Sequence, residues 1–359
     1  MVLYHAISSY QLLCAMVHKI LKNPGEKSVL LLPDFIVKKY PQYTEVVKLG
    51  IFDEVYLFPY LKIDHCEETI KQKTAYYYEL TVPYKIDMFR EINILGGHFY
   101  FSTYLIQKKI EFNFFEDAPG MLKKSEQLFY DLYKKYPVHA QVAQDNGLFS
   151  GKNEYIKTVY CLEGGDDNKF VKFDIHLWLK ELKKKDINKI IKFFRVDKIK
   201  IKKKSVVFFT QQFASLGIMS QIQQRNLISW LVNRMEQEVD VVVKTHPDDN
   251  EKYDFSERVE EIRIPFPAEL LPFIVSKRAM AAVTISSTSV IGAQYFCKYT
   301  FSFAEVFKDM YSHRDEYVSM INIMKYIEEE GKSYVQFFKK KESRKESRKG
   351  SSTQRHLRI

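Results

Sequence analysis

Short apolar runs of strand length alternate with longer amphipathic stretches through most of this 359-residue sequence. The segments 28–33 and 54–58 are typical of these runs, and 239–244 repeats the pattern in the second half. Continuous apolar strands separated by helices form parallel sheets that are covered on both faces. The alternation therefore predicts an α/β protein with parallel strands.

A lysine-rich stretch at 180–204 interrupts the alternation, and a chain of this length corresponds to about two domains. We therefore place a domain boundary there. The predicted parts are a Rossmann-like β/α/β domain at 1–165, a lysine-rich linker and helix at 166–204, a second Rossmann-like domain at 205–338, and a disordered basic tail at 339–359.

The formal net charge of +10 is concentrated in two segments. The segment 339–359 carries nine Lys or Arg against two Glu, and 180–204 carries twelve against three acids, which leaves the remainder at −6. This distribution argues against a nucleic-acid partner, although a basic nucleic-acid- or membrane-binding non-enzyme remains an alternative. Aromatic residues at 334–338 precede three lysines, which suits peripheral contact with anionic lipid; a last helix docked on the body explains them equally well.

The sequence argues against several classes of protein. Apolar runs are too short to cross a bilayer, and residues 1–15 resemble a strand and helix more than a signal peptide. The four cysteines are scattered, which is typical of reduced thiols in a cytosolic protein. Dinucleotide, P-loop, HExxH and GxSxG motifs are absent, and no acidic pair has metal-ligand spacing. The sequence therefore predicts no cofactor and no metal.

An acidic pair, Glu116-Asp117, follows the apolar run at 110–115 and leads into a Pro/Gly turn. Open α/β sheets bind ligands at the carboxyl ends of their strands, so a carboxylate there is a candidate general base. The alternative is a helix N-cap before 121–136.

Two polar segments follow predicted strands of the second domain. His246-Pro247 comes after 239–243, and proline holds the preceding residue extended, so the imidazole could protonate or hydrogen-bond a phosphate. Ser286, Ser287 and Thr288 precede a predicted helix, where hydroxyls and N–H groups can bind an anion. A lone surface histidine and an ordinary N-cap are the respective alternatives.

Two further loops are candidates for nucleotide binding. Thr210 and Gln211 end the first strand of the second domain, so their amides could meet a nucleotide. Glu269 opens a predicted helix at 267–275 and could accept hydrogen bonds from a ribose or base; otherwise it is a favourable first-turn acid.

The order of these motifs resembles bacterial sialyltransferases of GT-B fold, particularly glycosyltransferase family 52. Those enzymes carry an acidic motif, a His-Pro motif and a Ser/Thr pair in this order, and the segment 267–269 matches a Pro-x-Glu helix start. The segment 5–11 is also similar to the opening strand and loop of the family, which adds Ser9 to the candidates. The resemblance spans about residues 1–305, through motifs of two or three residues each.

The resemblance implies two Rossmann-like domains facing a central cleft, CMP-sialic acid as donor, inversion at the anomeric carbon, and no metal. Asp117 would be the base, with Glu116 as its rival, and His246 would stabilise or protonate the departing phosphate. The remaining residues would bind substrate: Ser286 and Ser287 the phosphate, and Thr210, Gln211 and Glu269 the cytidine nucleotide.

One departure from the family bears on the base. The glycine that directly follows the acids in the family is replaced here by Ala118-Pro119, with Gly120 displaced by two positions. The resemblance further implies that the acceptor is a sugar hydroxyl, of a terminal galactose type, on an oligosaccharide or glycolipid of a bacterial capsule or lipooligosaccharide. It also implies a cytoplasmic enzyme peripheral to the inner face of the membrane, and a homodimer. A GT-B transferase with a UDP- or CDP-linked donor is the alternative.

Overall fold

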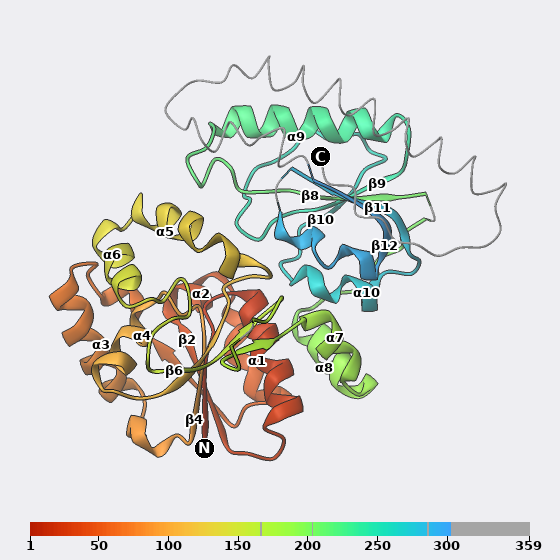
Figure 1. The fold of residues 1–359 in the computed structure, drawn as a ribbon. Helices are drawn as coiled ribbons and strands as arrows, with labels where there is room; N and C mark the ends of the chain where they lie inside the picture. Colours follow the sequence, from red (N-terminus) through yellow and green to blue (C-terminus); the bar gives the residue numbers. More distant parts are fainter. Residues whose placement is uncertain (166, 203, 286, 303–359) are drawn as a thin grey trace. The chain divides into compact units, whose positions relative to one another are not determined.

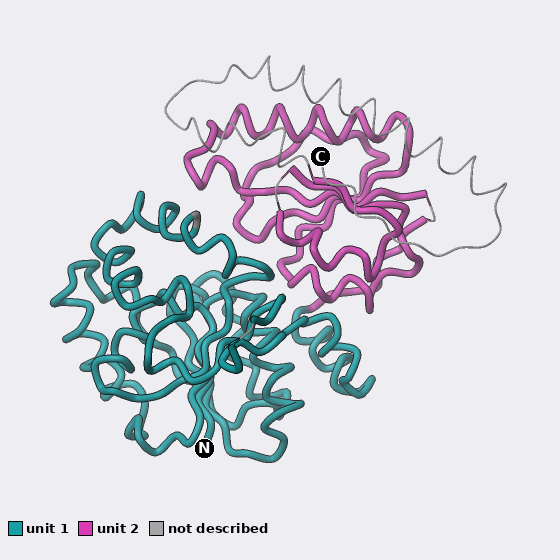
Figure 2. The backbone as a smooth tube through the Cα atoms, viewed as in Figure 1, with its two compact units in different colours: residues 1–194 teal, residues 195–359 magenta. Residues whose placement is uncertain are grey.

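The computed structural model describes residues 1–302 except Asp166, Lys203 and Ser286, and it divides the chain into two compact units. Unit 1 is Met1–Phe194 and unit 2 is Arg195–Ile359 (Figure 2). Each unit contains one fully parallel sheet with its own helices, which agrees with the α/β class predicted from the sequence. The tail predicted at 339–359, and the end of the second domain from residue 303, lie outside the described residues.

The sheet of unit 1 has seven strands in the order β3-β2-β1-β4-β5-β6-β7 (Figure 1). The strands are β1 (Val2–His5), β2 (Ser28–Pro33), β3 (Glu54–Phe58), β4 (Glu91–Leu95), β5 (Phe112–Phe115), β6 (Ile156–Cys161) and β7 (Phe170–Lys172). The α-helices are α1 (Ser9–Lys22), α2 (Asp34–Lys39), α3 (Glu67–Thr81), α4 (Tyr100–Gln107), α5 (Ser125–Tyr133), α6 (Pro137–Asp145), α7 (Ile175–Glu181) and α8 (Lys184–Phe193). Four 3₁₀ segments complete the unit: η1 (Pro41–Leu49), η2 (Tyr60–Lys62), η3 (Ile86–Met88) and η4 (Met121–Lys124).

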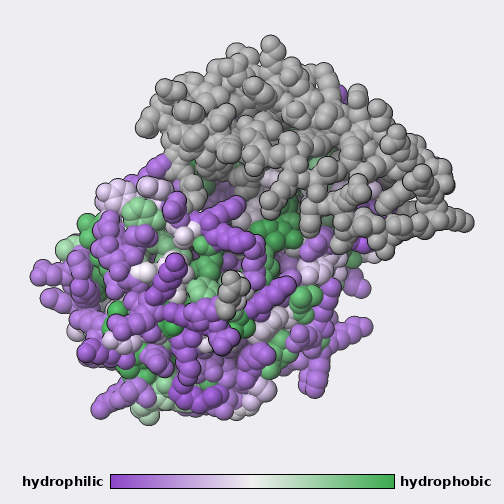
Figure 3. Space-filling model, viewed as in Figure 1, coloured by the Kyte–Doolittle hydropathy of each residue, from purple (hydrophilic) through white to green (hydrophobic). Residues whose placement is uncertain are grey.

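The core of unit 1 explains why β2 is a continuous apolar run. All six residues of β2 are buried, because α3 and α4 cover one face of the sheet while α1 and α7 cover the other. Helix α1 begins where the Ser8 hydroxyl accepts a hydrogen bond from the Gln11 N–H. On the face of unit 1 seen in Figure 3, hydrophilic side chains predominate, with apolar ones scattered among them.

The sheet of unit 2 has five strands in the order β10-β9-β8-β11-β12. The strands are β8 (Val206–Phe209), β9 (Val241–Lys244), β10 (Glu260–Ile262), β11 (Ala279–Thr284) and β12 (Cys297–Ser302). The helical segments are α9 (Gln221–Glu236), α10 (Leu271–Ile274), η5 (Ala268–Leu270), η6 (Thr288–Val290) and η7 (Ala293–Tyr295). A capping box formed by Ser220 and Gln223 fixes the start of α9, which packs on the buried face of β8 and β9.

The boundary between the units differs from the predicted linker at 166–204. It falls between Phe194 and Arg195, because β7 pairs with β6 and α7 packs on α1, which places this segment in unit 1. Leu179 and Ile190 are fully buried there. Despite its lysines, this segment thus forms two helices whose apolar side chains pack against unit 1.

The structure also differs from the prediction of a helix at the Ser287 segment. The chain forms only the short 3₁₀ turns η6 and η7 between β11 and β12. Ser287 accepts a hydrogen bond from the Ser289 N–H and so caps η6, the alternative considered for this segment. Among the described residues, no helix is both long and apolar enough to cross a bilayer.

Candidate functional site

The topology of both sheets places the candidate residues at the carboxyl edge of their own unit. Strand order reverses between β1 and β4 in unit 1 and between β8 and β11 in unit 2, and ligands of open α/β sheets bind at such points. Glu116 and Asp117 follow β5, His246 lies two residues after β9, and Ser287 lies three residues after β11.

The two acids of unit 1 have different environments. Glu116 is 5% exposed; its Oε1 accepts a hydrogen bond from the Leu162 N–H at 2.6 Å and its Oε2 one from the Leu122 N–H at 3.3 Å. Burial raises the pKa of Glu116 above its ordinary value. These contacts tie the loop after β5 to the loop after β6, so Glu116 has a structural role in unit 1.

Asp117 is held at the edge of the sheet by contacts on one carboxylate oxygen. Its side chain is 29% exposed, Oδ1 accepts a 2.9 Å hydrogen bond from Gln11 Nε2, and His98 Nδ1 lies 3.9 Å from Oδ1. Burial lowers the pKa of His98, so this imidazole is neutral at neutral pH. Asp117 therefore combines exposure with a fixed orientation, which a general base needs.

Two glycines allow the loop after β4 to reach this site. Gly96 has a φ of +83°, and a Cβ there would overlap the Ile7 side chain, while a Cβ on Gly97 would overlap the ring of Phe114. Only glycine fits so close to these neighbours, and the close approach carries His98 toward Asp117. His98 and Gln11 were not among the residues predicted for the site; the Gly96-Gly97 pair is the sequence signal that could have located His98.

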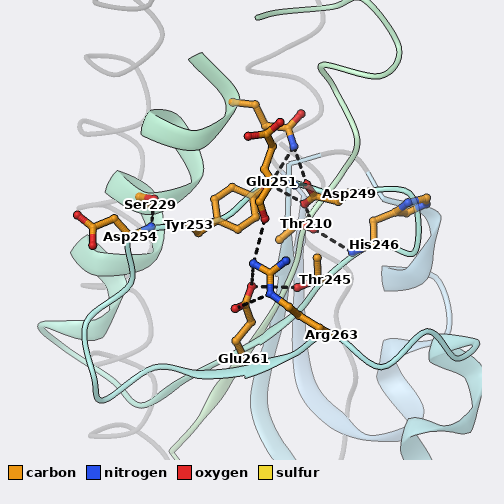
Figure 4. A network of polar contacts seen from close by, with 11 residues as sticks. Thr210, Ser229, Thr245, His246, Asp249, Glu251, Tyr253, Asp254, Glu261 and Arg263 are labelled. Carbon is orange, nitrogen blue, oxygen red and sulfur yellow. Dashed lines mark hydrogen bonds and ion pairs between the residues drawn. The ribbon is translucent and has the colours of Figure 1, made fainter. Parts of the chain in front are cut away.

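The turn after β9 fixes the orientation of the His246 ring. The Asp248 N–H lies 3.0 Å from His246 Nδ1, so Nδ1 accepts and the proton of a neutral imidazole is on Nε2. The His246 side chain is 27% exposed, and Figure 4 shows the ring pointing away from the acidic cluster around Asp249. The imidazole thus lies at the carboxyl edge with a donor on its outer nitrogen, and Pro247 beside it is half-buried.

Other predicted residues of unit 2 lie along the same edge. Ser287 is buried, and its hydroxyl donates to Ser289 Oγ at 3.1 Å. Gln211 and Thr288 are half-buried, whereas Ser286 lies outside the described residues.

Two of the residues predicted for the site, Thr210 and Ser9, form side-chain hydrogen bonds within their own units. Thr210 is 2% exposed, and its hydroxyl contacts Asp249 and the backbone of His246. In unit 1, the Ser9 hydroxyl pairs with the Tyr43 hydroxyl at 2.6 Å, so Gln11, two positions later, is the residue of this segment that contacts Asp117.

A cavity of about 550 Å³ opens at the opposite edge of the unit 1 sheet. Tyr78, Tyr84 and Tyr104 line it together with Ile86, just before β4, and Ile110, just before β5. No residue predicted for the site lines this cavity.

A family model described as alpha-2,8-polysialyltransferase (POLYST) matches residues 17–301. The chain belongs to this family. The protein is therefore a glycosyltransferase of the sialyltransferase class, and the alternative of a non-enzyme is wrong. Glycosyltransferase family 52, which the motif order resembled, is not the family that matches. No curated protein matches the sequence.

Solved structures show the fold of this polysialyltransferase-family protein. An alpha/beta-galactoside alpha-2,3-sialyltransferase from Photobacterium phosphoreum is similar with a TM-score of 0.50 at 15% identity, over 90% of this chain and 95% of that one. A UDP-GlcNAc 2-epimerase from Methanocaldococcus jannaschii has a TM-score of 0.48 at 10% identity, over 84% and 83%. The likeness to the sialyltransferase confirms the predicted GT-B class.

The described part of this polysialyltransferase-family protein has no group of three or more His, Cys, Asp or Glu side chains that could hold a metal ion. The independence from metals stays a prediction.

Lys244 and Glu269 form a buried pair of opposite charge at the edge of unit 2. Lys244 is 3% exposed, its Nζ donates to the Thr245 carbonyl at 3.0 Å, and it lies 4.5 Å from the centre of the Phe266 ring. Burial lowers the pKa of Lys244 to about 8 and raises that of Glu269 to about 7. Both groups thus titrate near neutral pH in the polysialyltransferase-family protein.

Replacing Glu269 by glutamine should change how stability depends on pH. Because the pKa of Glu269 rises from 4.5 to about 7 on folding, its ionisation penalises the folded state increasingly across that interval. The free energy of unfolding of Glu269→Gln relative to wild type should therefore increase with pH, by on the order of 3 kcal/mol at most. Denaturant titrations at pH 5 and pH 8 measure this, with the exposed Glu257→Gln as control; a difference independent of pH would contradict it.

Proposed function

We propose that the protein transfers sialic acid from CMP-sialic acid to a hydroxyl of a saccharide acceptor, with inversion and without a metal. The observation that carries this proposal is the Asp117 carboxylate, which is partly exposed at the carboxyl edge while its neighbour Glu116 is bound to backbone amides. Membership in the polysialyltransferase family supports the class of reaction.

The proposed reaction gives each residue one task. The acceptor hydroxyl attacks the anomeric carbon of sialic acid, its proton passes to Asp117, and the bond from that carbon to the phosphate oxygen breaks. His246 donates from Nε2 to the phosphate of departing CMP. The Ser287 N–H donates to Thr284 Oγ1 at 3.0 Å, so the Ser287 hydroxyl is the group that would add a hydrogen bond to the phosphate, by rotating away from Ser289 Oγ. Donors aimed at developing charge commonly supply the largest share of rate acceleration.

The family description favours a sialic acid acceptor and an α2,8 bond. We therefore propose that the enzyme extends a sialic acid terminus on a bacterial capsule or lipooligosaccharide. A galactose terminus, expected from the motif resemblance, is the competing acceptor.

Location and assembly are proposed on the sequence alone. The basic segment 339–359 and the aromatics before it would hold a cytoplasmic enzyme against the anionic inner face of the membrane. A homodimer is proposed from the motif resemblance.

Incubation with donor and acceptor tests the proposed function. With CMP-sialic acid and an α2,8-linked sialic acid oligomer, we expect mass spectrometry to show products longer by one or more sialic acids; a galactose-terminated acceptor should not be extended. EDTA should leave turnover unchanged. Extension of galactose alone would overturn the acceptor assignment, and loss of turnover in EDTA would overturn independence from metals.

Nucleotide binding tests the donor separately from turnover. CMP should raise the unfolding temperature more than UDP or GDP at equal concentrations, because a ligand that binds only the folded state stabilises it. Stabilisation by UDP but not CMP would replace CMP-sialic acid with a UDP-linked donor.

A further inference from the structure

The Thr210 hydroxyl joins the end of β8 to the turn that carries His246. It donates to Asp249 Oδ2 at 2.6 Å and accepts from the His246 N–H at 2.9 Å (Figure 4). Thr210 is also tied by its backbone, because its N–H donates to the Lys244 carbonyl at 3.2 Å. The hydroxyl has one hydrogen to give, and Asp249 takes it.

Asp249 is the centre of a buried polar network at this edge of unit 2. Asp249 is 5% exposed, and its carboxylate accepts four hydrogen bonds. Oδ2 accepts from the hydroxyls of Thr210 and Tyr253, the latter at 2.5 Å. Oδ1 accepts from Gln224 Nε2 at 3.0 Å and from the Glu251 N–H at 3.2 Å. Every partner donates to the carboxylate, which favours its ionised form, while burial raises the pKa of Asp249 above its ordinary value.

The network anchors the turn after β9 to helix α9. Gln224 and Arg225 are residues of α9, and Arg225 pairs with Glu251 at 3.1 Å. The Asp254 N–H donates to Ser229 Oγ of the same helix at 3.0 Å. The turn itself is closed by the Asp249 N–H, which donates to the His246 carbonyl at 2.9 Å. The His246 backbone is therefore held at both its N–H and its carbonyl.

We propose that Thr210 and Asp249 are positioning residues, which hold the His246 backbone so that its Nε2–H is aimed at the leaving phosphate. This inference rests on the proposed function, and it assigns the Thr210 hydroxyl a role different from the nucleotide contact expected from the sequence. A phosphate oxygen can only accept hydrogen bonds, so the Thr210 hydroxyl could donate to it only by releasing Asp249.

Three substitutions separate positioning from direct contact. Thr210→Val keeps the shape and removes the hydroxyl, Thr210→Ser restores the hydroxyl, and Asp249→Asn presents an amide N–H₂ to donors that need an acceptor. Tyr253→Phe is the matched control, because it removes another hydroxyl from the same carboxylate oxygen and leaves Thr210 in place.

Steady-state kinetics give the first readout. Thr210→Val should lower kcat by about 10- to 100-fold, as small misplacements of catalytic groups do, with the KM for CMP-sialic acid within about twofold. Thr210→Ser and Tyr253→Phe should retain kcat within about threefold of wild type. A raised donor KM with unchanged kcat in Thr210→Val would show that the hydroxyl contacts the nucleotide and would overturn the proposal.

The ring of His246 gives a second readout that needs no substrate. In proteins with ¹⁵N-labelled histidine, the His246 signal, assigned by its loss in His246→Gln, should show the Nε2–H tautomer in wild type, Thr210→Ser and Tyr253→Phe. Thr210→Val should populate both tautomers. Asp249→Asn should also populate both, and it provides the test if the valine variant does not fold. An unchanged tautomer in the folded variants would overturn positioning, whereas absence of turnover in wild type would overturn only the proposed donor or acceptor.

Discussion

Asp117→Asn should reduce kcat by about 10²- to 10⁴-fold, the usual contribution of a general base, and should leave the fold intact. The asparagine oxygen can still accept the hydrogen bond from Gln11 Nε2, so the side chain keeps its orientation and loses only its basicity. Steady-state turnover of CMP-sialic acid measures the effect, and the unfolding temperature should stay near that of wild type.

Glu116→Gln is the matched variant for this prediction. Its amide would place an N–H₂ group against the N–H of either Leu162 or Leu122, so we expect a loss of stability of about 1–3 kcal/mol. Turnover per folded molecule should fall far less than in Asp117→Asn. The opposite ranking, with Glu116→Gln inactive and Asp117→Asn active, would make Glu116 the base.

His246→Ala should reduce kcat by about 10²- to 10³-fold, the usual effect of removing one donor to developing charge. His246→Gln offers an amide donor at a similar distance from the backbone, so it should recover part of the loss in kcat. The recovery should be incomplete, because an amide cannot release a proton. Because the side chain is half-buried at the surface edge, both variants should unfold near the wild-type temperature.

Asp248→Ala controls for this prediction. It removes the carboxylate 3.9 Å from His246 Nδ1 and keeps the backbone N–H that holds the ring, so kcat should change less than about tenfold. Wild-type kcat in His246→Ala would remove the imidazole from the mechanism.

The sequence located the loops at the strand ends more accurately than the side-chain contacts within those loops. Apolar runs identified β2 and β3 to the residue and located β5 and β9 closely, because strands of a parallel sheet that is covered by helices are largely apolar. The strand β4 was missed, because Asn93 interrupts its apolar residues. With β4 missed, His98 was not placed beside Asp117.

Hydrogen-bond partners distant in sequence account for the other differences. Glu116 and Asp117 are adjacent and chemically alike, so their partners distinguish them: the amides of Leu122 and Leu162 bind Glu116, whereas Gln11 binds Asp117. Thr210 was expected to bind nucleotide because it ends a strand, but Asp249, 39 residues later, takes its hydroxyl proton. The segment with α7 and α8 was predicted as a linker and helix outside the first domain, because the lysines at 180–204 drew attention away from the apolar residues that pack on unit 1.

The alternation of apolar and amphipathic segments by itself determined the parallel α/β class, because a strand buried on both faces must be apolar. The sialyltransferase class came from the sequence through a resemblance, since the order of its short motifs is similar to that of a known family. The tertiary structure alone decided which acid is exposed, which hydroxyl is buried, and where unit 1 ends. These properties depend on partners tens of residues away, and the sequence pattern around each residue does not specify which partner it meets.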